Sequence, residues 1–367
     1  MRRRTFLTAT AGVAGTTLAG CITQSDDGGD GDEMETLTTP ESFEGELTVA
    51  TYEAFVDAPS TSPGEWVKQA FESEYPDVTL NWEVAENGVT EYVQRAGRDA
   101  SIDADVYLGL NVDDLVVADR ELDESLFLST DVYGMENDGA VKDALRFDPQ
   151  SRAVPYDTGY IALVYDETEV DEPASLDDLT TDPYEGTLLA QNAQSSDPGR
   201  AFMLRTVDQY SEDGYLDYWS DLVANDVRIF DSWGDSYDAY GQEERPMVVS
   251  YSTDQVYANR YDQDMSRHQV AFPDRKGYAN PEGMAVFEGS DTPALGFEFL
   301  DFLLSAEAQG EIAVRNVQLP ATDHAELDEE FDQYAHEPEE AVVFSYDELS
   351  GNLDGWVDEW AREIAGN

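Results

Sequence analysis

The residues that could do chemistry in this 367-residue chain do not form the motif of a common enzyme. The sequence contains no G-x-S-x-G nucleophile elbow, no H-E-x-x-H zinc motif and no phosphate-binding loop. The three histidines, His268, His324 and His336, show no metal-ligand spacing. Carboxylates are so frequent that no acid–base pair stands out. The sequence therefore favours a binding protein without a cofactor or bound metal over an enzyme.

Aromatic and small polar residues follow several apolar runs, where α/β sheets present their ligand crevices. Tyr52 ends the first run, and the segment 195–199 precedes a helix with Pro198 in its first turn. There, hydroxyls and free N–H groups could meet an anion or an acceptor. Aromatic faces suit flat or cationic ligands, at about 0.5–2 kcal/mol per cation–π contact, although each ring could equally be core. A second aromatic group surrounds a later strand: Trp233, Tyr237, Tyr251 and Tyr257.

Strands and helices alternate along the chain with short connections, which predicts an α/β fold with a mainly parallel sheet. Hydrophobic periodicity predicts strands over 47–52, 78–84, 104–110, 161–165, 187–191 and 246–251. It predicts helices over 65–75, 89–95, 200–210, 215–224, 295–304, 306–314 and 353–364. About 320 residues are too many for one small core. We therefore expect two lobes with a cleft between them: lobe 1 over 46–158 and 288–367, and lobe 2 over 159–287.

The N-terminus has the pattern of an export signal. Residues 1–21 contain Arg3-Arg4 before a short apolar run that ends in Leu18-Ala19-Gly20-Cys21. The arginine pair is typical of the twin-arginine route, and the ending is typical of a lipoprotein signal. Cys21, the only cysteine, is the expected lipidation site, which also leaves no disulfide framework. Residues 22–45 are acidic and rich in Gly and Ser, so we expect a flexible tether to the extracellular face of the membrane.

The charge balance is extreme, with 80 acidic residues against 20 basic ones and a net charge of −60. This charge argues against nucleic-acid binding, because phosphates demand the opposite sign. Self-repulsion of this size favours solubility and is tolerable where molar salt shortens the Debye length to about 3 Å. The acidic, lysine-poor composition is therefore typical of a halophilic protein.

From about residue 46 onward, the chain resembles the thiamine-binding proteins of bacterial thiamine ABC transporters. The order of several short blocks carries the resemblance, rather than any single block. In chain order they are 51–55 (TYEAF), 104–110 (ADVYLGL), 155–160 (PYDTGY), 164–166 (VYD), 195–199 (SSDPG), 232–237 (SWGDSY), 250–253 (SYST), 299–302 (FLDF), Trp356 and Trp360.

The resemblance implies a periplasmic-binding-protein fold of type II, in which two lobes close like a hinge around the ligand. It implies thiamine or a thiamine phosphate as the transported ligand, an ABC permease as the membrane partner, and a monomer. Aromatic rings would sandwich the ligand, and Ser196 would bond its polar end. The implied ligand-binding residues are Tyr52, Asn87, Asp157, Ser196, Trp233, Tyr251 and Tyr257.

Three positions depart from the pattern of that family. Asn87 stands where the family has an acidic residue, and Val317 stands where it has a tryptophan. A second family tryptophan has no counterpart around 60–63. The lost anion and rings leave the fold expectation intact and weaken the expectation of thiamine itself.

Other ligands and one enzyme class remain as alternatives. Ferric-ion binders share this fold and bind through tyrosines, usually adjacent ones, whereas Tyr251 and Tyr257 are six positions apart. A polyamine or another organic cation would need several carboxylates in the cleft. A lipoprotein hydrolase would use Ser236, since 234–236 resembles the nucleophile block of one esterase family. That role requires an exposed serine beside a histidine.

Overall fold

The computed structural model describes residues 36–57, 62–85 and 87–365. The expected signal, Cys21, most of the expected tether and the loop around residue 60 lie outside these ranges. The described end of the expected tether is attached to the protein: Leu37 N–H donates to the Val132 carbonyl at 2.8 Å. Phe43 packs edge-on against Tyr75, with ring centroids 5.6 Å apart. In the described ranges, no helix is both long and apolar enough to cross a bilayer.

One mixed sheet runs through the whole molecule, in the strand order β2-β1-β3-β9-β4-β7-β5-β6. The outer parts are parallel, because β1 pairs with β2 and β3, and β5 with β6 and β7, in that sense. The centre is antiparallel, from β3 through β9 and β4 to β7. The expectation of a mainly parallel sheet is therefore wrong at the centre. The chain passes out along β4 and returns along β9, so these two strands must run in opposite directions.

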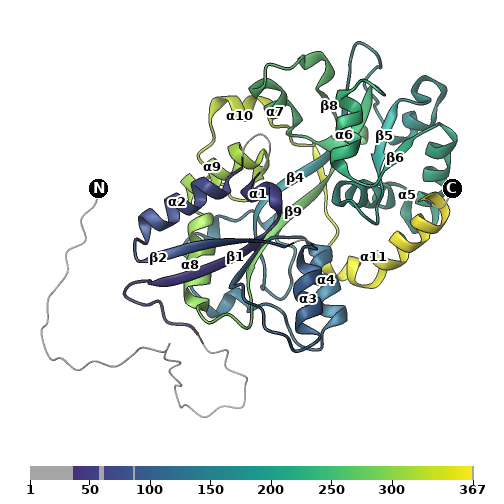
Figure 1. Cartoon of the computed structure of the whole chain (residues 1–367). Coiled ribbons are helices and arrows are strands. Elements are labelled where there is room, and N and C mark those ends of the chain that lie inside the picture. Colours follow the sequence, from purple (N-terminus) through teal and green to yellow (C-terminus); the bar gives the residue numbers. More distant parts are fainter. Residues whose placement is uncertain (1–35, 58–61, 86, 366–367) are drawn as a thin grey trace, which may run out of the picture.

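Lobe 1 is the name used here for the elements around β1–β3, shown at the lower left of Figure 1. Its strands and helices are β1 (Gly45–Thr51), α1 (Glu53–Val56), α2 (Gly64–Glu74), β2 (Val78–Val84), α3 (Val89–Ala96), β3 (Val106–Leu110), α4 (Val112–Glu121), α8 (Pro293–Leu303) and α9 (Ala306–Asn316).

Lobe 2 is built around β5–β7 at the upper right of Figure 1. Its elements are β5 (Leu188–Gln191), α5 (Asp197–Ala224), β6 (Arg228–Phe230), α6 (Trp233–Gly241), β7 (Met247–Tyr251), α7 (Asp254–Arg260) and β8 (Gln269–Ala271). The two helices expected over 200–224 form one element, α5, which is kinked at Ser211, where φ is 62°.

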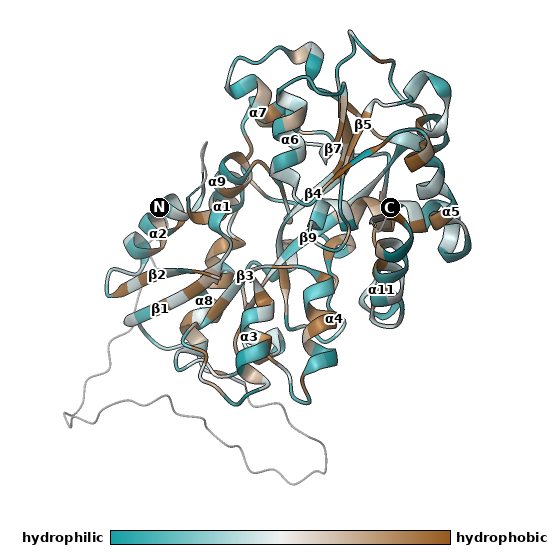
Figure 2. Cartoon of the chain, turned by 45° about the vertical axis from the view of Figure 1, so that its right-hand side comes forward, coloured by the Kyte–Doolittle hydropathy of each residue, from teal (hydrophilic) through white to brown (hydrophobic). Residues whose placement is uncertain are grey.

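Two long strands, β4 (Val154–Tyr165) and β9 (Lys276–Val286), join the lobes. Every residue of β4 is buried, including the polar Asp157 and Thr158 in an otherwise largely apolar strand. The hydropathy colours of Figure 2 show apolar strands inside and mixed polar and apolar helices outside. The chain ends with β10 (Leu319–Pro320), α10 (Glu329–Tyr334), β11 (Glu340–Val342), α11 (Tyr346–Trp360) and one π-helical turn (Ala361–Ala365).

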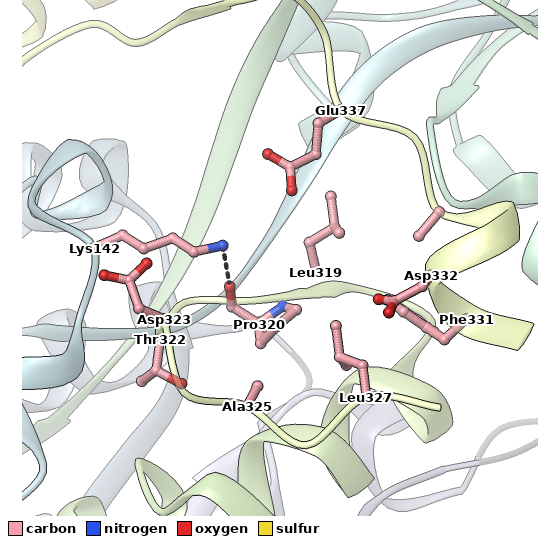
Figure 3. A pocket seen from close by; sticks show the side chains of 11 residues that line it. Lys142, Leu319, Pro320, Thr322, Asp323, Ala325, Leu327, Phe331, Asp332 and Glu337 are labelled. Carbon is pink, nitrogen blue, oxygen red and sulfur yellow. Dashed lines mark hydrogen bonds between the residues drawn. The ribbon is translucent and has the colours of Figure 1, made fainter. Parts of the chain in front are cut away.

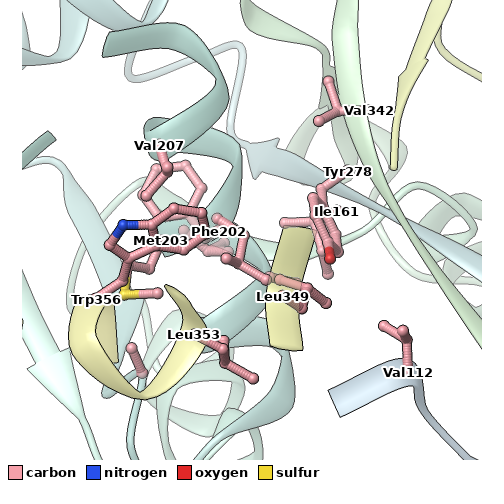
Figure 4. Packing of buried hydrophobic residues seen from close by; sticks show 14 of the residues in the cluster. Val112, Ile161, Phe202, Met203, Val207, Tyr278, Val342, Leu349, Leu353 and Trp356 are labelled. Atoms are coloured by element: carbon pink, nitrogen blue, oxygen red, sulfur yellow. The ribbon is translucent and has the colours of Figure 1, made fainter. Parts of the chain in front are cut away.

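The C-terminal helix α11 packs against both lobes. Its residues Leu349, Leu353 and Trp356 share a buried cluster with side chains of α5, as Figure 4 shows. Trp360 meets the Trp219 ring edge-on at 5.2 Å. On the lobe 1 side, the Tyr346 hydroxyl donates to Asp119 of α4. The helix expected within lobe 1 therefore bridges α4 and α5.

Candidate functional site

Two carboxylates face each other at the centre of the sheet. Asp157 of β4 lies opposite Glu282 of β9 in the antiparallel pairing, beside a register shift at Tyr156. Asp157 is fully buried, and its Oδ2 accepts a hydrogen bond from Asn316 Nδ2 at 2.8 Å. Among the described residues, its Oδ1 has no hydrogen-bond partner. Asp157 and Glu282 are called the carboxylate pair below.

Neutral hydroxyl and amide groups surround the carboxylate pair. Tyr156 donates from its hydroxyl to Glu282 Oε2 at 2.7 Å. The Tyr52 hydroxyl lies 3.3 Å from that of Tyr156 and accepts from Asn316 Nδ2 at 2.9 Å. Asn316, the last residue of α9, therefore connects Tyr52, which follows β1, to Asp157 of β4.

Burial and mutual repulsion act on the carboxylate pair. Burial raises the pKa of Asp157 well above its usual range, and the charge of Glu282 raises it further. Burial also raises the pKa of Glu282, although the hydroxyls of Tyr156 and Tyr52 partly oppose this. Within the described residues, the charged groups that act on the pair are acidic, namely its two members and Asp197. Neither Asp157 nor Glu282 forms an ion pair with a basic side chain in the described residues, whereas Asp197 lies 3.6 Å from Arg200.

An aromatic platform lies at the start of α6 in lobe 2. Trp233 stacks on Tyr237 with centroids 4.9 Å apart and ring planes 24° from parallel, and its Nε1 donates to Ser250 Oγ at 3.1 Å. Tyr251 lies at the end of β7, and its ring centroid is 6.3 Å from that of Trp233. We call Trp233, Tyr237 and Tyr251 the aromatic platform. One face of Trp233 is covered by Tyr237, yet the residue remains 36% exposed, so its other face is available to a ligand.

Tyr251 connects the platform to the carboxylate pair. Burial raises the pKa of Tyr251, and the nearby charges of Glu282, Asp197 and Asp157 raise it further. Its ring lies directly over Gly159 of β4, where a Cβ atom would be 2.5 Å from the ring. A side chain at Gly159 would therefore push Tyr251 away from the strand that carries Asp157.

The Tyr52 ring is seated in the same way on lobe 1. It lies over Gly109 of β3, where a Cβ would be 2.6 Å from the ring, and where the φ of 100° also favours glycine. Burial raises the pKa of Tyr52, and Glu282 and then Asp157 add to the effect. A tyrosine from each lobe thus lies beside the carboxylate pair, Tyr52 from lobe 1 and Tyr251 from lobe 2.

Tyr257 belongs to the edge of this group. It lies on α7 and packs against Tyr261, with ring centroids 4.8 Å apart. Asp254, at the start of the same helix, accepts from the hydroxyl of Tyr237 and is 2.7 Å from Nδ1 of His268. The contact of Asp254 with Tyr237 ties α7 to the aromatic platform, and Tyr257 lies on this same helix.

Ser196 lies at the N-terminus of α5 on the lobe 2 side. It is 5% exposed, and its Oγ has no partner among the described residues. The first turn of α5 is held by Arg200, which pairs with Asp113 of α4 and lies 3.6 Å from Asp197. Because Arg200 ties α5 to α4, it fixes Ser196 relative to lobe 1.

Two of the positions that depart from the family pattern lie in the described ranges. Asn87 is exposed in the turn before α3. A Cβ on the neighbouring Gly88 would be 3.4 Å from the Tyr107 hydroxyl. The pKa of Tyr107 is raised mainly by burial and also by nearby acids that include Glu282 and Asp197. We call the carboxylate pair together with Asp197 the acidic region, and Asn87 lies at its edge. Val317 ends α9 with a positive φ of 56° and packs in the small cluster around Tyr160.

Sequence reasoning missed several residues of the site. Glu282, Tyr156 and Asn316 complete the contacts of Asp157 and Tyr52, and none of them was predicted to bind ligand. Tyr156 lies within the block 155–160, so its place beside Asp157 was a signal that could have found it. Glu282 and Asn316 gave no such signal, because their partners are distant in sequence.

Ser236 and one separate cavity help to delimit the site. Ser236 is fully buried, donates to the Trp233 carbonyl and accepts from Gln191 Nε2, so it does not fit the exposed nucleophile that a hydrolase requires. A cavity of about 290 Å³ lies beside β10 and α10 (Figure 3). Lys142 lies on its wall and donates to the Pro320 carbonyl at 3.2 Å. None of the predicted ligand residues lines this cavity.

The two lobes are joined by the paired strands β4 and β9, which carry two carboxylates without a basic partner in the described residues, and Trp233 of lobe 2 has an exposed face. Such an arrangement can hold a small cation. Solved structures share the architecture. A periplasmic thiamin binding protein superposes with a TM-score of 0.74 at 26% identity, covering 89% of this chain and 99% of that one. A ferric binding protein from Campylobacter jejuni reaches 0.69 at 14% identity over 86% of this chain, a likeness that shows the fold alone. The fold is that of the type II periplasmic binding proteins.

The chain belongs to the bacterial extracellular solute-binding proteins, whose family model matches residues 66–339. The thiamine-binding periplasmic proteins of Salmonella typhimurium and Escherichia coli are each 27% identical to it over 323 residues, which is 87% of this chain and 93% of theirs. The corresponding protein of Haemophilus influenzae is 25% identical over 321 residues. The expectation of a solute-binding protein of this kind is confirmed.

Proposed function

We propose that this protein captures thiamine or a thiamine phosphate between its lobes and delivers it to an ABC permease. The observation that carries the proposal is the carboxylate pair flanked by tyrosines of both lobes. Thiamine has a flat ring and a cationic ring, which suit an exposed tryptophan face and an unbalanced negative site. Relatives named for thiamine binding, with over 90% of their length matched, support the same ligand.

Each predicted ligand residue has a proposed role in this arrangement. Trp233 and Tyr251 stack on the ligand from lobe 2, and Tyr52 closes on it from lobe 1. Asp157 balances the positive charge, and Ser196 bonds the polar end. Tyr257 and Asn87 stand at the margin. The hinge lies in β4 and β9, between lobe 1 (46–158 and 288–367) and lobe 2 (159–287).

A thermal-shift screen in molar KCl tests the ligand. Thiamine, thiamine phosphates, ferric citrate and putrescine are compared with the full chain. A ligand present at 100 times its dissociation constant adds about 2.7 kcal/mol of stability, a shift of a few degrees. We expect thiamine or one of its phosphates to give this shift. A shift with putrescine alone would mean that the ligand is another organic cation, and a shift with ferric citrate alone would mean that it is iron.

The proposed cellular setting is the extracellular face of the membrane, reached by the twin-arginine route, with a monomer anchored by lipid on Cys21. The lone cysteine after Leu18-Ala19-Gly20 supports the anchor, and the net charge of −60 supports a high-salt environment. Replacing Cys21 by Ser is expected to move the protein from the membrane fraction into the medium. Retention of the variant in the membrane fraction would contradict the anchor.

A further inference from the structure

The carboxylate pair combines three features that a purely structural acid pair would not need. Asp157 and Glu282 are opposite each other on the two strands that join the lobes. Asp157 is fully buried, with one oxygen bonded to Asn316 and the other without a partner among the described residues. Two negative charges in such a place repel each other and lose their hydration, so one of them favours its neutral form.

The groups that act directly on the carboxylate pair are acids and neutral groups. Asp197, on α5, adds to the effect of burial on the pKa of Glu282. The nearest cation beyond them is Arg200, which pairs with Asp113 and lies 3.6 Å from Asp197. The titratable hydroxyls nearby, which the raised pKa of each keeps protonated, are those of Tyr52, Tyr107, Tyr156 and Tyr251. The basic side chains on adjoining segments are engaged elsewhere: Arg315, next to Asn316, pairs with Glu311, and Lys142 donates to the Pro320 carbonyl.

We propose that Asp157 and Glu282 share one proton while the site is empty, and that a cationic ligand displaces this proton when it binds. The inference rests on the proposed function in that it takes the ligand to be a thiamine cation. The exchange is balanced: one carboxyl O–H bond breaks, its proton passes to solvent, and the ligand's positive charge takes its place. The pair would thus favour cations over neutral compounds of the same shape.

Proton displacement has a defined pH signature. Because ligand and proton compete, affinity rises with pH, by at most about tenfold per pH unit for each proton released. The raised pKa values of both acids place this dependence above the usual carboxylate range. Once both carboxylates are ionised, the affinity levels off.

Calorimetric titration of the full chain with thiamine tests this between about pH 6.5 and 8.5. Buffers with different protonation heats, such as phosphate and Tris, report the number of protons released. We expect the wild type to release up to one proton and to bind more tightly as pH rises. Glu282→Gln keeps an acceptor for Tyr156, so it is expected to remain folded, with little proton release and a flat pH profile.

Asp301→Asn is the matched control. Asp301 lies on α8, its pKa is also raised by burial, and it accepts from Asn137 N–H at 2.8 Å, outside the site. This variant is expected to release protons as the wild type does. Tight thiamine binding by the wild type with equal heats in both buffers and no pH dependence would overturn the proton exchange alone. No thiamine binding at any pH would overturn the proposed function and the inference with it.

Discussion

Two groups of buried acids in this molecule differ in whether a basic side chain balances their charge. In lobe 1, the Asp148 side chain is fully buried and that of Asp119 is mostly buried, and both receive bidentate hydrogen bonds from Arg152. Burial alone would lower the pKa of Arg152, but the bonds to Asp119 and Asp148 outweigh it and raise the pKa. At the lobe junction, the carboxylate pair has no such partner among the described residues.

The difference separates negative charge that serves structure from negative charge that we propose is free for a ligand. A buried acid that fixes a loop needs a permanent counter-ion, because an unpaired charge inside a protein is costly. Asp157 and Glu282 instead have hydroxyl and amide neighbours, and we propose that the ligand supplies their counter-ion. In a chain with 80 acidic residues, the missing partner marks the site better than the presence of carboxylates.

The largest effect is expected when the ion pairs of Arg152 with Asp148 and Asp119 are broken. Arg152→Met leaves Asp148 and Asp119 buried without a counter-ion, so the free energy of unfolding should fall by about 3–5 kcal/mol. Chemical denaturation in a fixed salt concentration measures it. Arg120→Met, which removes exposed pairs with Glu121 and Asp354, is the control and should cost at most about 1 kcal/mol. Equal losses in both variants would contradict the distinction.

Removing a charge from the carboxylate pair should weaken ligand binding without destabilising the fold, the opposite of the effect expected for Arg152→Met. Asp157→Asn keeps an oxygen acceptor for Asn316 and relieves the repulsion from Glu282, so the unfolding free energy should be unchanged or higher. Thiamine binding should weaken by about 1.5–3 kcal/mol, the range for a hydrogen bond or contact with a charged group. Calorimetry and denaturation on the same preparation check both. A destabilised variant with intact affinity would mean that the carboxylate pair serves the fold and not the ligand.

The pH dependence of stability sharpens the same contrast. The folded protein holds protons on the carboxylate pair more tightly than the unfolded chain does, because both pKa values are raised on folding. The stability that the pair contributes is therefore present at low pH and is lost as pH rises from the unfolded carboxylate pKa, about 4, through the folded values. Denaturation across pH should show a shallower fall in the unfolding free energy of Asp157→Asn than in that of the wild type. Parallel profiles would count against the raised pKa values.

Aromatic truncations should affect binding and leave folding intact. Trp233→Ala and Tyr257→Ala are each expected to weaken thiamine binding by about 0.5–2 kcal/mol, the range of one cation–π contact. Tyr261→Ala removes only the ring that packs on Tyr257, so it should matter less. Unchanged affinity in both Trp233→Ala and Tyr257→Ala would rule out an aromatic sandwich.

The smallest expected effect comes from restoring the acid at Asn87. Asn87→Asp adds an exposed carboxylate at the edge of the acidic region, so thiamine affinity should rise by about 0.2–1 kcal/mol at low ionic strength. Molar salt should remove most of this gain, because it shortens the reach of an exposed charge. Binding titrations at two salt concentrations check it. A gain that survives molar salt would point to direct contact with the ligand.

Local pattern was enough for much of the fold. The strand expected over 78–84 has those bounds as β2, and the strand expected over 161–165 forms the second part of β4, which begins earlier, at Val154. The return strand β9 was not predicted, because Asn280, Pro281 and Glu282 interrupt its apolar pattern. Such a strand forms because β3 and β4 supply its partners, and that information lies far away in the sequence.

Part of the candidate site follows from local sequence, although its role in binding stays a prediction. The types and spacing of Trp233 and Tyr251 pointed to an aromatic group, and the structure brings these two rings together. Glu282 could not be recognised from its residue type alone. It belongs to the candidate site because it lies opposite Asp157 on the neighbouring strand and has no basic neighbour in the described residues. Asn316 illustrates the same limit, because its contacts with Tyr52 and Asp157 span much of the chain.

The position of α11 has a consequence for how the molecule is made. Its side chains fill the seam between α4 and α5, with Trp360 fully buried against Trp219. The ribosome produces this helix after the strands and helices of both lobes, so the lobes lack their shared seal until α11 has been made. A message truncated shortly before Tyr346 would yield a chain with nearly every ligand residue in place but an open apolar seam. Such a product would be recognised by proteases and chaperones as unfinished.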